Sequence, residues 1–177
     1  MLVKINGQEE SFETKQDLES RLKELNPLIL KTVKIPNKYS IKGLGSELKL
    51  LETIRVAVIG SRTYDNYQEF SAIMTKYIKK KENTIVEFVS GGAKGADSLI
   101  ERYAEENGYR IYVFPADWSK GKSAGFQRNV TIWNNADEGI AFWDGKSKGT
   151  EHSFKLSKKQ NKNLYVFNYI EKKWVTI

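Results

Sequence analysis

Two glycine-rich turns contain the residues of this chain best suited to chemistry. The first consists of Gly60, Ser61 and Arg62, at the end of the run RVAVIG. The second, SGGAKGAD, spans residues 90–97 and follows the run TIVEFV. Glycine allows the backbone to approach a ligand closely, and free N–H groups at the start of a following helix attract phosphate. Arg62 and Lys94 add positive charge to the turns, which therefore predict binding of a nucleotide-type ligand.

The elements that must position these turns alternate regularly from Arg55 onward. Hydrophobic periodicity predicts strands at residues 55–60, 84–90, 109–115, 138–143 and 163–168, and helices at about 66–81, 95–107, 123–135 and 150–161. Strands as apolar as VAVIG and IYVF require helices on both faces of a parallel sheet. With right-handed crossovers, this pattern predicts an α/β fold: a Rossmann-like, doubly wound, mainly parallel sheet in a three-layer sandwich.

The carboxyl ends of the predicted strands locate the site. Ligands of doubly wound folds lie at this edge of the sheet. The turns at Gly60, Gly91, Pro115 and Asp144 all follow predicted strands, so we expect them to converge there. The last run, YIEKKWVTI, is expected to add an antiparallel edge strand.

Residues 1–54 are predicted to form a small N-terminal α+β extension, and residues 55–177 the main domain. MLVKI and EESFET resemble paired strands around Asn6 and Gly7, KQDLESRLKEL has helical spacing after Thr14, and LILKTVKI reads as another strand. Residues 37–52 hold two glycines and no clear core pattern, which predicts a connector or a short helix. We find no chemistry in this extension.

Composition excludes several classes of site. The 177 residues include no cysteine, which rules out disulfides, thiolate zinc sites and cysteine nucleophiles. His152 is the only histidine and lacks a second metal ligand at helical spacing, so neither a metal nor a cofactor is assigned. The N-terminus resembles no leader, and no apolar run is long enough to span a bilayer. We therefore expect a cytoplasmic protein with no membrane partner.

Two familiar nucleotide motifs are missing. Gly121, Lys122 and Ser123 resemble the end of a P-loop, but Ala116 occupies the position of its first glycine. No G-x-G-x-x-G opens the first helix of the main domain, which argues against a dehydrogenase.

Positive charge gathers at the C-terminal end. The net charge is +7, and residues 144–177 account for +5 of it. Such a segment attracts phosphate compounds in general, so nucleic acid remains an alternative partner.

The ordered motifs GSR, SGGAKGAD, FPADW, AGFQRN and SKGT resemble those of the YspA-like branch of the SLOG superfamily, which includes the LOG phosphoribohydrolases and DprA. The resemblance covers about residues 55–168. It implies a ligand that is a nucleotide or derived from one. Carried over by position, the ligand-binding residues are Gly60, Ser61, Arg62, Gly91, Gly92, Lys94, Gly95, Asp97, Arg128, Asn129, Gly149 and Thr150.

Chemical roles for the later residues follow from their types. Thr150 is expected to open a helix after Gly149 and to hold a terminal phosphate. Arg128 suits a bidentate contact to phosphate or ribose, and Asn129 a contact to sugar or base. Alternatively, Arg128 forms an ion pair with Asp117 or Asp137.

Two tryptophans and two acidic residues complete the candidates. Trp118 and Trp143 either stack on a base or pack against the sheet. The phosphoribohydrolases have a glutamate three residues after the threonine, and here Ser153 takes that place. Glu151 and Asp97 are the candidate catalytic carboxylates that remain.

We therefore expect ligand binding, as a sensor or sequestering module, to be the leading function. A nucleotide N-glycosidase and a DprA-like single-stranded DNA binder are the alternatives. A homodimer is compatible with the apolar helix content.

Overall fold

The computed structural model describes residues 2–5, 8–11, 39–42, 49–81 and 84–176 of the chain, with side chains from residue 53 onward. The chain divides into two compact units, one of residues 1–53 with 82–85, the other of residues 54–81 with 86–177. The helix expected in KQDLESRLKEL and the strand expected in LILKTVKI lie outside the described residues.

In the first unit, short strands pair antiparallel. β1 (Leu2–Ile5) pairs with β2 (Gln8–Ser11), which confirms the two predicted N-terminal strands. β3 (Tyr39–Lys42) pairs with the first four residues of β4 (Lys49–Gly60). The connector or short helix expected at residues 37–52 is therefore wrong. YSIK alternates apolar and polar residues, and its backbone groups find partners in KLLE seven or more residues away.

The second unit holds the main sheet, in the order β6-β5-β4-β7-β8-β9. Its further strands are β5 (Thr84–Ser90), β6 (Ile111–Val113), β7 (Glu138–Trp143), β8 (Leu164–Asn168) and β9 (Lys173–Val175). The pairs β4–β7, β5–β6 and β7–β8 are parallel. β9 runs antiparallel to β8, which confirms the predicted edge strand.

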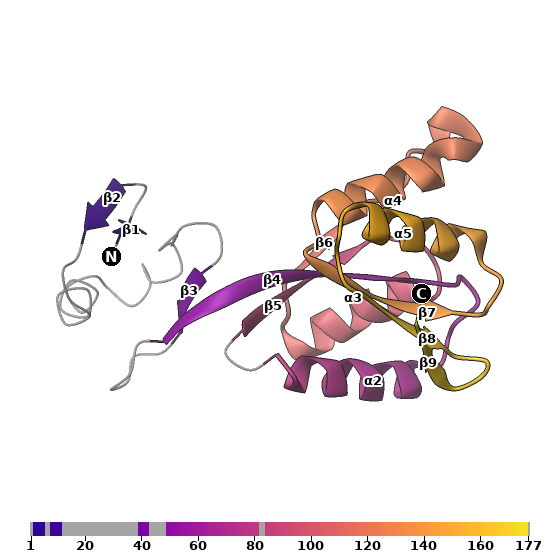
Figure 1. The fold of residues 1–177 in the computed structure, drawn as a ribbon, viewed down its shortest axis with the longest axis horizontal. Helices are drawn as coiled ribbons and strands as arrows, with labels where there is room; N and C mark the ends of the chain where they lie inside the picture. Colours follow the sequence, from indigo (N-terminus) through magenta and orange to yellow (C-terminus); the bar gives the residue numbers. More distant parts are fainter. Residues whose placement is uncertain (1, 6–7, 12–38, 43–48, 82–83, 177) are drawn as a thin grey trace. The chain divides into compact units, whose positions relative to one another are not determined.

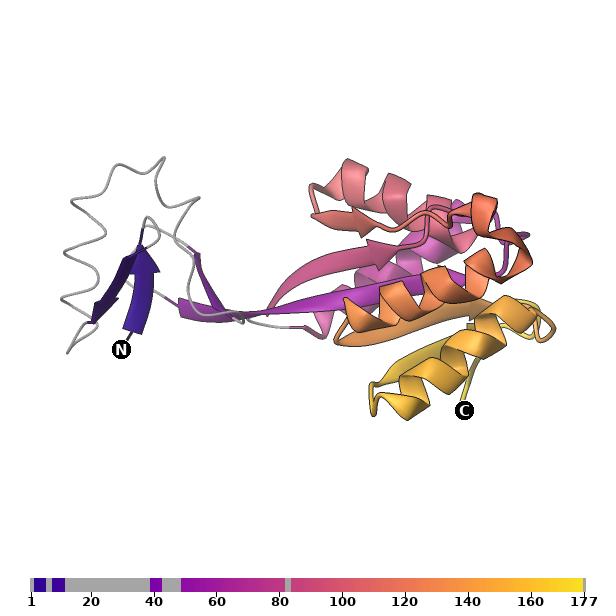
Figure 2. The same ribbon diagram turned by 90° about the horizontal axis from the view of Figure 1, so that it is seen from above.

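Four α-helices cover this sheet. α2 (Tyr67–Lys79) and α3 (Ala96–Asn107) lie on one face, and α4 (Ala124–Asn134) and α5 (Lys148–Lys159) on the other (Figures 1 and 2). A short 3₁₀ helix, η2 (Trp118–Ser123), precedes α4. The three layers confirm the predicted Rossmann-like fold. Within the described residues, no helix combines the length and the apolar character needed to cross a membrane.

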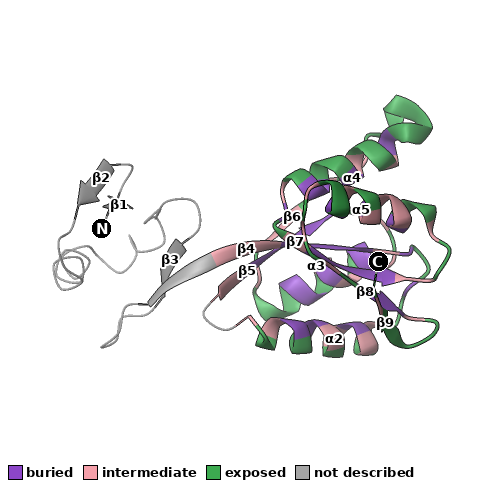
Figure 3. Ribbon diagram, viewed as in Figure 1, coloured by how far each residue is buried: buried purple, intermediate pink, exposed green. Residues whose placement is uncertain are grey.

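Residues 56–59 of β4 lie at the centre of the core and are buried (Figure 3). Val56 and Val58 point toward the cluster under α2 and α3, and Ala57 and Ile59 toward the cluster under α4 and α5. All four side chains are at most 5% exposed. Successive side chains of a strand point to opposite faces, and both faces are covered here, so all four residues of the run VAVI are apolar. The end of β4, from which the first glycine turn emerges, is thus firmly held.

Three elements differ clearly from their predicted bounds. β4 begins at Lys49 instead of Arg55, because its first four residues pair with β3. β6 covers only residues 111–113 of the expected 109–115. α5 begins at Lys148 instead of Thr150, because Ser147 is the N-cap and its side chain accepts a hydrogen bond from the Thr150 N–H.

Candidate ligand-binding site

A cavity of about 470 Å³ opens in the second unit and is lined by segments that follow β4, β5, β6 and β7. Small-molecule sites commonly have this size. Eight of the twelve predicted ligand residues line it: Gly60, Ser61, Arg62, Asp97, Arg128, Asn129, Gly149 and Thr150. Gly91, Gly92, Lys94, Gly95 and the candidate acid Glu151 are not among the lining residues.

The first glycine turn is tied to the end of the neighbouring strand. The Ser61 N–H donates to the Phe142 carbonyl at 2.9 Å, and the Asp144 N–H donates to Ser61 Oγ at 3.2 Å. Ser61 is therefore buried, while Arg62 is exposed. The Arg62 guanidinium lies 5.6 Å from the ring centroid of Trp118 and makes no ion pair with any described residue. Its charge remains available to an anion in the cavity.

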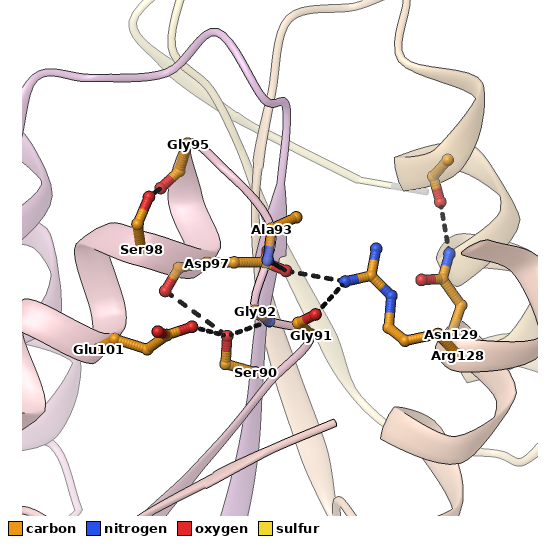
Figure 4. A network of polar contacts seen from close by, with 11 residues as sticks. Ser90, Gly91, Gly92, Ala93, Gly95, Asp97, Ser98, Glu101, Arg128 and Asn129 are labelled. Carbon is orange, nitrogen blue, oxygen red and sulfur yellow. Dashed lines mark hydrogen bonds and ion pairs between the residues drawn. The ribbon is translucent and has the colours of Figure 1, made fainter. Parts of the chain in front are cut away.

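Hydrogen bonds link the second turn to Arg128 on α4 (Figure 4). Asp97 Oδ2 accepts hydrogen bonds from the Ala93 N–H at 3.2 Å and from Arg128 Nη1 at 3.1 Å. Arg128 Nη1 also donates to the Gly91 carbonyl at 2.7 Å. A Cβ at Gly91 would fall 1.8 Å from Arg128 Nη1, so a larger residue there would displace the guanidinium.

Arg128 and Asp97 thus form a nearly buried ion pair that joins α4 to the start of α3. Their side chains are 12% and 5% exposed. Burial raises the pKa of Asp97, against the opposing effects of Arg128 and the Ala93 N–H. The expected partners of Arg128 were wrong. Asp137 accepts a hydrogen bond from the Arg55 N–H at 2.9 Å, and Asp117 Oδ1 accepts one from the Ser119 N–H at 3.2 Å. The expectation of an ion pair overlooked Asp97, which lies 31 residues away in the sequence.

The start of α5 uses several groups that were expected to bind phosphate. The Thr150 hydroxyl donates to Ser147 Oγ at 3.0 Å, and Asn129 Nδ2 donates to the Gly149 carbonyl at 3.0 Å. Thr150 and Asn129 are both buried. The backbone N–H groups of Lys148 and Gly149 have no acceptor in the described part of the chain. These two N–H groups, rather than the threonine hydroxyl, are the open donors at this helix end.

The cavity also contains residues that the sequence did not mark as ligand-binding. They are two exposed lysines, an exposed phenylalanine, the N-cap serine and one carboxylate: Lys122, Lys146, Phe126, Ser147 and Asp144. All belong to segments that follow a strand of the sheet or open a helix. The positive charge of residues 144–177 had pointed to Lys146, and placement at the carboxyl edge was the signal for the others.

The two tryptophans differ in their surroundings. Trp118 lines the cavity and is 57% exposed, and Phe126 beside the same cavity is 46% exposed. Trp143 packs edge-on against Phe154, with ring centroids 5.2 Å apart, and is not among the lining residues. Phe126 also packs edge-on against His152, with ring centroids 4.7 Å apart, but both it and Trp118 keep exposed ring surface beside the cavity, whereas Trp143 does not line it.

Comparisons with known proteins identify the family of this chain. Residues 54–121 match the model of the YspA, cpYpsA-related SLOG family. Over 126 residues, the chain is 32% identical to the Gene 61 protein of Mycobacterium phage D29, an alignment that covers 67% of this chain and 98% of the phage protein. The chain belongs to this SLOG family.

A solved structure of DNA processing protein A from Helicobacter pylori, described by its single-stranded DNA binding mode, is also similar to this SLOG protein. The two are 23% identical with a TM-score of 0.48, and the match covers 64% of each chain. This SLOG protein therefore spans about two thirds of the length of that chain.

Proposed function

We propose that this SLOG protein binds a nucleotide or a nucleotide-derived ligand in the cavity, as a sensor or a sequestering module. The observation that carries the proposal is the meeting of open cationic groups and exposed aromatic rings in one cavity. Arg62, Lys122 and Lys146 line it and make no ion pair with a described residue. Trp118 and Phe126 line the same space. Phosphate plus a flat base is the common ligand that uses both kinds of group.

Backbone donors add to this charge. The N–H groups of Lys148 and Gly149 lie at the positive end of α5 and have no acceptor among the described residues. Helix N-termini of this kind favour phosphate. Membership of the SLOG family supports the same ligand class, since the resemblance implies nucleotide-derived ligands.

Catalysis receives less support than binding. Of the two candidate acids, Glu151 does not line the cavity, and Asp97 is paired with Arg128. Cleavage of an N-glycosidic bond needs a carboxylate close to the ribose. Neither of these two carboxylates is both in the cavity and free of a cation, so the acids that the sequence offered do not support catalysis and we place ligand binding first.

The experiment compares Arg62→Ala and Lys122→Ala with the wild type by isothermal titration against nucleoside mono-, di- and cyclic phosphates and ADP-ribose. Each variant removes a hydrogen bond to a charged phosphate, which weakens binding by about 10- to 100-fold. Lys159→Ala is the matched control, because it removes the same charge from the last turn of α5, outside the cavity. Equal affinity in all four proteins would refute the proposal.

The same mixtures separate the alternatives. Chromatography after incubation detects release of free base, which would establish the N-glycosidase in place of a binding module. A single-stranded oligonucleotide, titrated at two salt concentrations, tests nucleic-acid binding. An affinity that falls steeply with salt, together with no mononucleotide binding, would favour the DNA-binding alternative.

A further inference from the structure

Asp144 is the one carboxylate of the cavity that no cation of the described residues neutralises. It follows β7 directly and lies between the first glycine turn and the start of α5. The other lining carboxylate, Asp97, is paired with Arg128 at 3.1 Å. The two carboxylates therefore have different roles. Asp97 holds α3 and α4 together through Arg128, whereas Asp144 presents an uncompensated negative charge to the cavity.

Hydrogen bonds fix the Asp144 carboxylate in place. Oδ1 accepts the N–H groups of Lys146 at 2.9 Å and of Ser147 at 2.7 Å. Burial acts to raise the pKa of Asp144, but these bonds and the Ser61 hydroxyl outweigh it and hold the pKa below its usual value. The group is thus ionised at neutral pH. Both of these backbone N–H groups bond to Oδ1, so Oδ2 keeps lone pairs that a ligand can use.

A fixed negative charge limits what a ligand can place beside it. The phosphate of a nucleotide is itself anionic, so close approach to Asp144 costs electrostatic energy in a partly desolvated cavity. The ligand must turn a hydrogen-bond donor toward Oδ2 instead. In a nucleotide, the donors are the ribose hydroxyls and the amino or imino groups of the base. The exposed rings of Trp118 and Phe126, carried by η2 and α4, provide a separate surface for the base.

We propose that Asp144 accepts a hydrogen bond from the ribose hydroxyls of the bound ligand, so that the site selects ribonucleotides over deoxyribonucleotides. This inference rests on the proposed nucleotide-binding function. It assigns the phosphate to Arg62, Lys122, Lys146 and the N–H groups of α5, and the sugar to Asp144. Asp144 is therefore a specificity-determining residue.

The test uses AMP, GMP, CMP and UMP, each paired with its 2′-deoxy and 3′-deoxy form, and pyrophosphate as a probe without sugar. Wild type and Asp144→Asn are titrated in parallel. Asparagine keeps an oxygen that can accept the N–H groups of Lys146 and Ser147, so the loop is retained while the charge is removed. Thermal unfolding of both proteins verifies that the fold is intact.

We expect the wild type to bind at least one ribonucleotide about tenfold or more tightly than one of its deoxy forms, and Asp144→Asn to reduce that preference to less than threefold. Pyrophosphate should bind the variant more tightly than the wild type, because a repulsive charge is lost. If Asp144 had only a structural role, Asp144→Asn would lower the affinity for all ligands by a similar factor.

Three results would overturn the inference. Equal affinity of the wild type for ribose and deoxyribose forms, with binding still dependent on Arg62 and Lys122, would remove the role of Asp144 and leave the proposed function standing. AMP and inosine monophosphate carry the same ribose but differ in the amino group of the base. If the wild type, but not Asp144→Asn, prefers AMP over inosine monophosphate, Asp144 contacts the base instead of the ribose. Failure of the wild type to bind any nucleotide would overturn both proposals.

Discussion

Replacement of Arg128 by methionine should destabilise the folded protein even without ligand. Nη1 of Arg128 joins the Gly91 carbonyl at 2.7 Å to Asp97 Oδ2 at 3.1 Å, and both charged side chains are at least 88% buried. Methionine preserves most of the side-chain volume but leaves Asp97 as an uncompensated buried charge. Removal of one partner of such a pair costs about 3–5 kcal/mol. This is a large share of the total stability of a domain, about 5–15 kcal/mol.

Urea unfolding, followed by tryptophan fluorescence, measures the free energy of unfolding of the wild type, Arg128→Met, Asp97→Asn and the double variant. The double variant should lose less than the sum of the single losses, because it contains no unpaired charge. A loss below 1 kcal/mol for Arg128→Met, or strict additivity, would refute the assigned support role. Ligand binding by Arg128→Met is interpretable only after this measurement.

The deficit of Arg128→Met should also depend on pH. Burial already raises the pKa of Asp97, and loss of Arg128 removes an opposing effect, so the pKa rises further. A carboxyl whose pKa is higher in the folded than in the unfolded state binds a proton preferentially in the folded state. Its contribution to stability is present at low pH and is lost as the pH rises through the folded-state pKa. The deficit should therefore be smaller at pH 5 than at pH 8, and a deficit that grows toward acid would contradict this.

Two further substitutions test the supports of the site. Gly95→Ala should cost about 3 kcal/mol, because Gly95 has a φ of +82° and a Cβ there would lie 2.2 Å from the Ser61 carbonyl oxygen. Gly108→Ala is its control and should cost about 1 kcal/mol, since Gly108 has a φ of +70° but open space around it. Equal urea midpoints for these two variants would contradict the steric argument. Ser147→Ala removes the N-cap of α5 and should lower the free energy of unfolding by about 1 kcal/mol, whereas an unchanged midpoint would show that the cap is not needed.

The sequence by itself determined the layers of the main domain and the edge at which its turns meet. Strands such as β5 and β7 were predicted at their observed bounds, because apolar runs buried on both faces are a local property of the chain. The position of the cavity followed from the same pattern, since parallel strands bring their carboxyl ends to one edge. Residues 37–52 were misread, because the strand pairing of β3 depends on a partner segment farther along the chain.

Only the tertiary structure decided which polar side chains remain open to a ligand. Arg128 and Thr150 have the chemistry to bind phosphate, yet Ser147 already accepts from the Thr150 hydroxyl, and Asp97 and the Gly91 carbonyl already accept from Arg128 Nη1. Asp144 was recognised from the sequence only as a turn, and its uncompensated charge became apparent once the neighbours of both lining carboxylates were known. A donor or acceptor is available only when no neighbour uses it. Those neighbours come from distant parts of the chain, so residue type and spacing alone do not identify them.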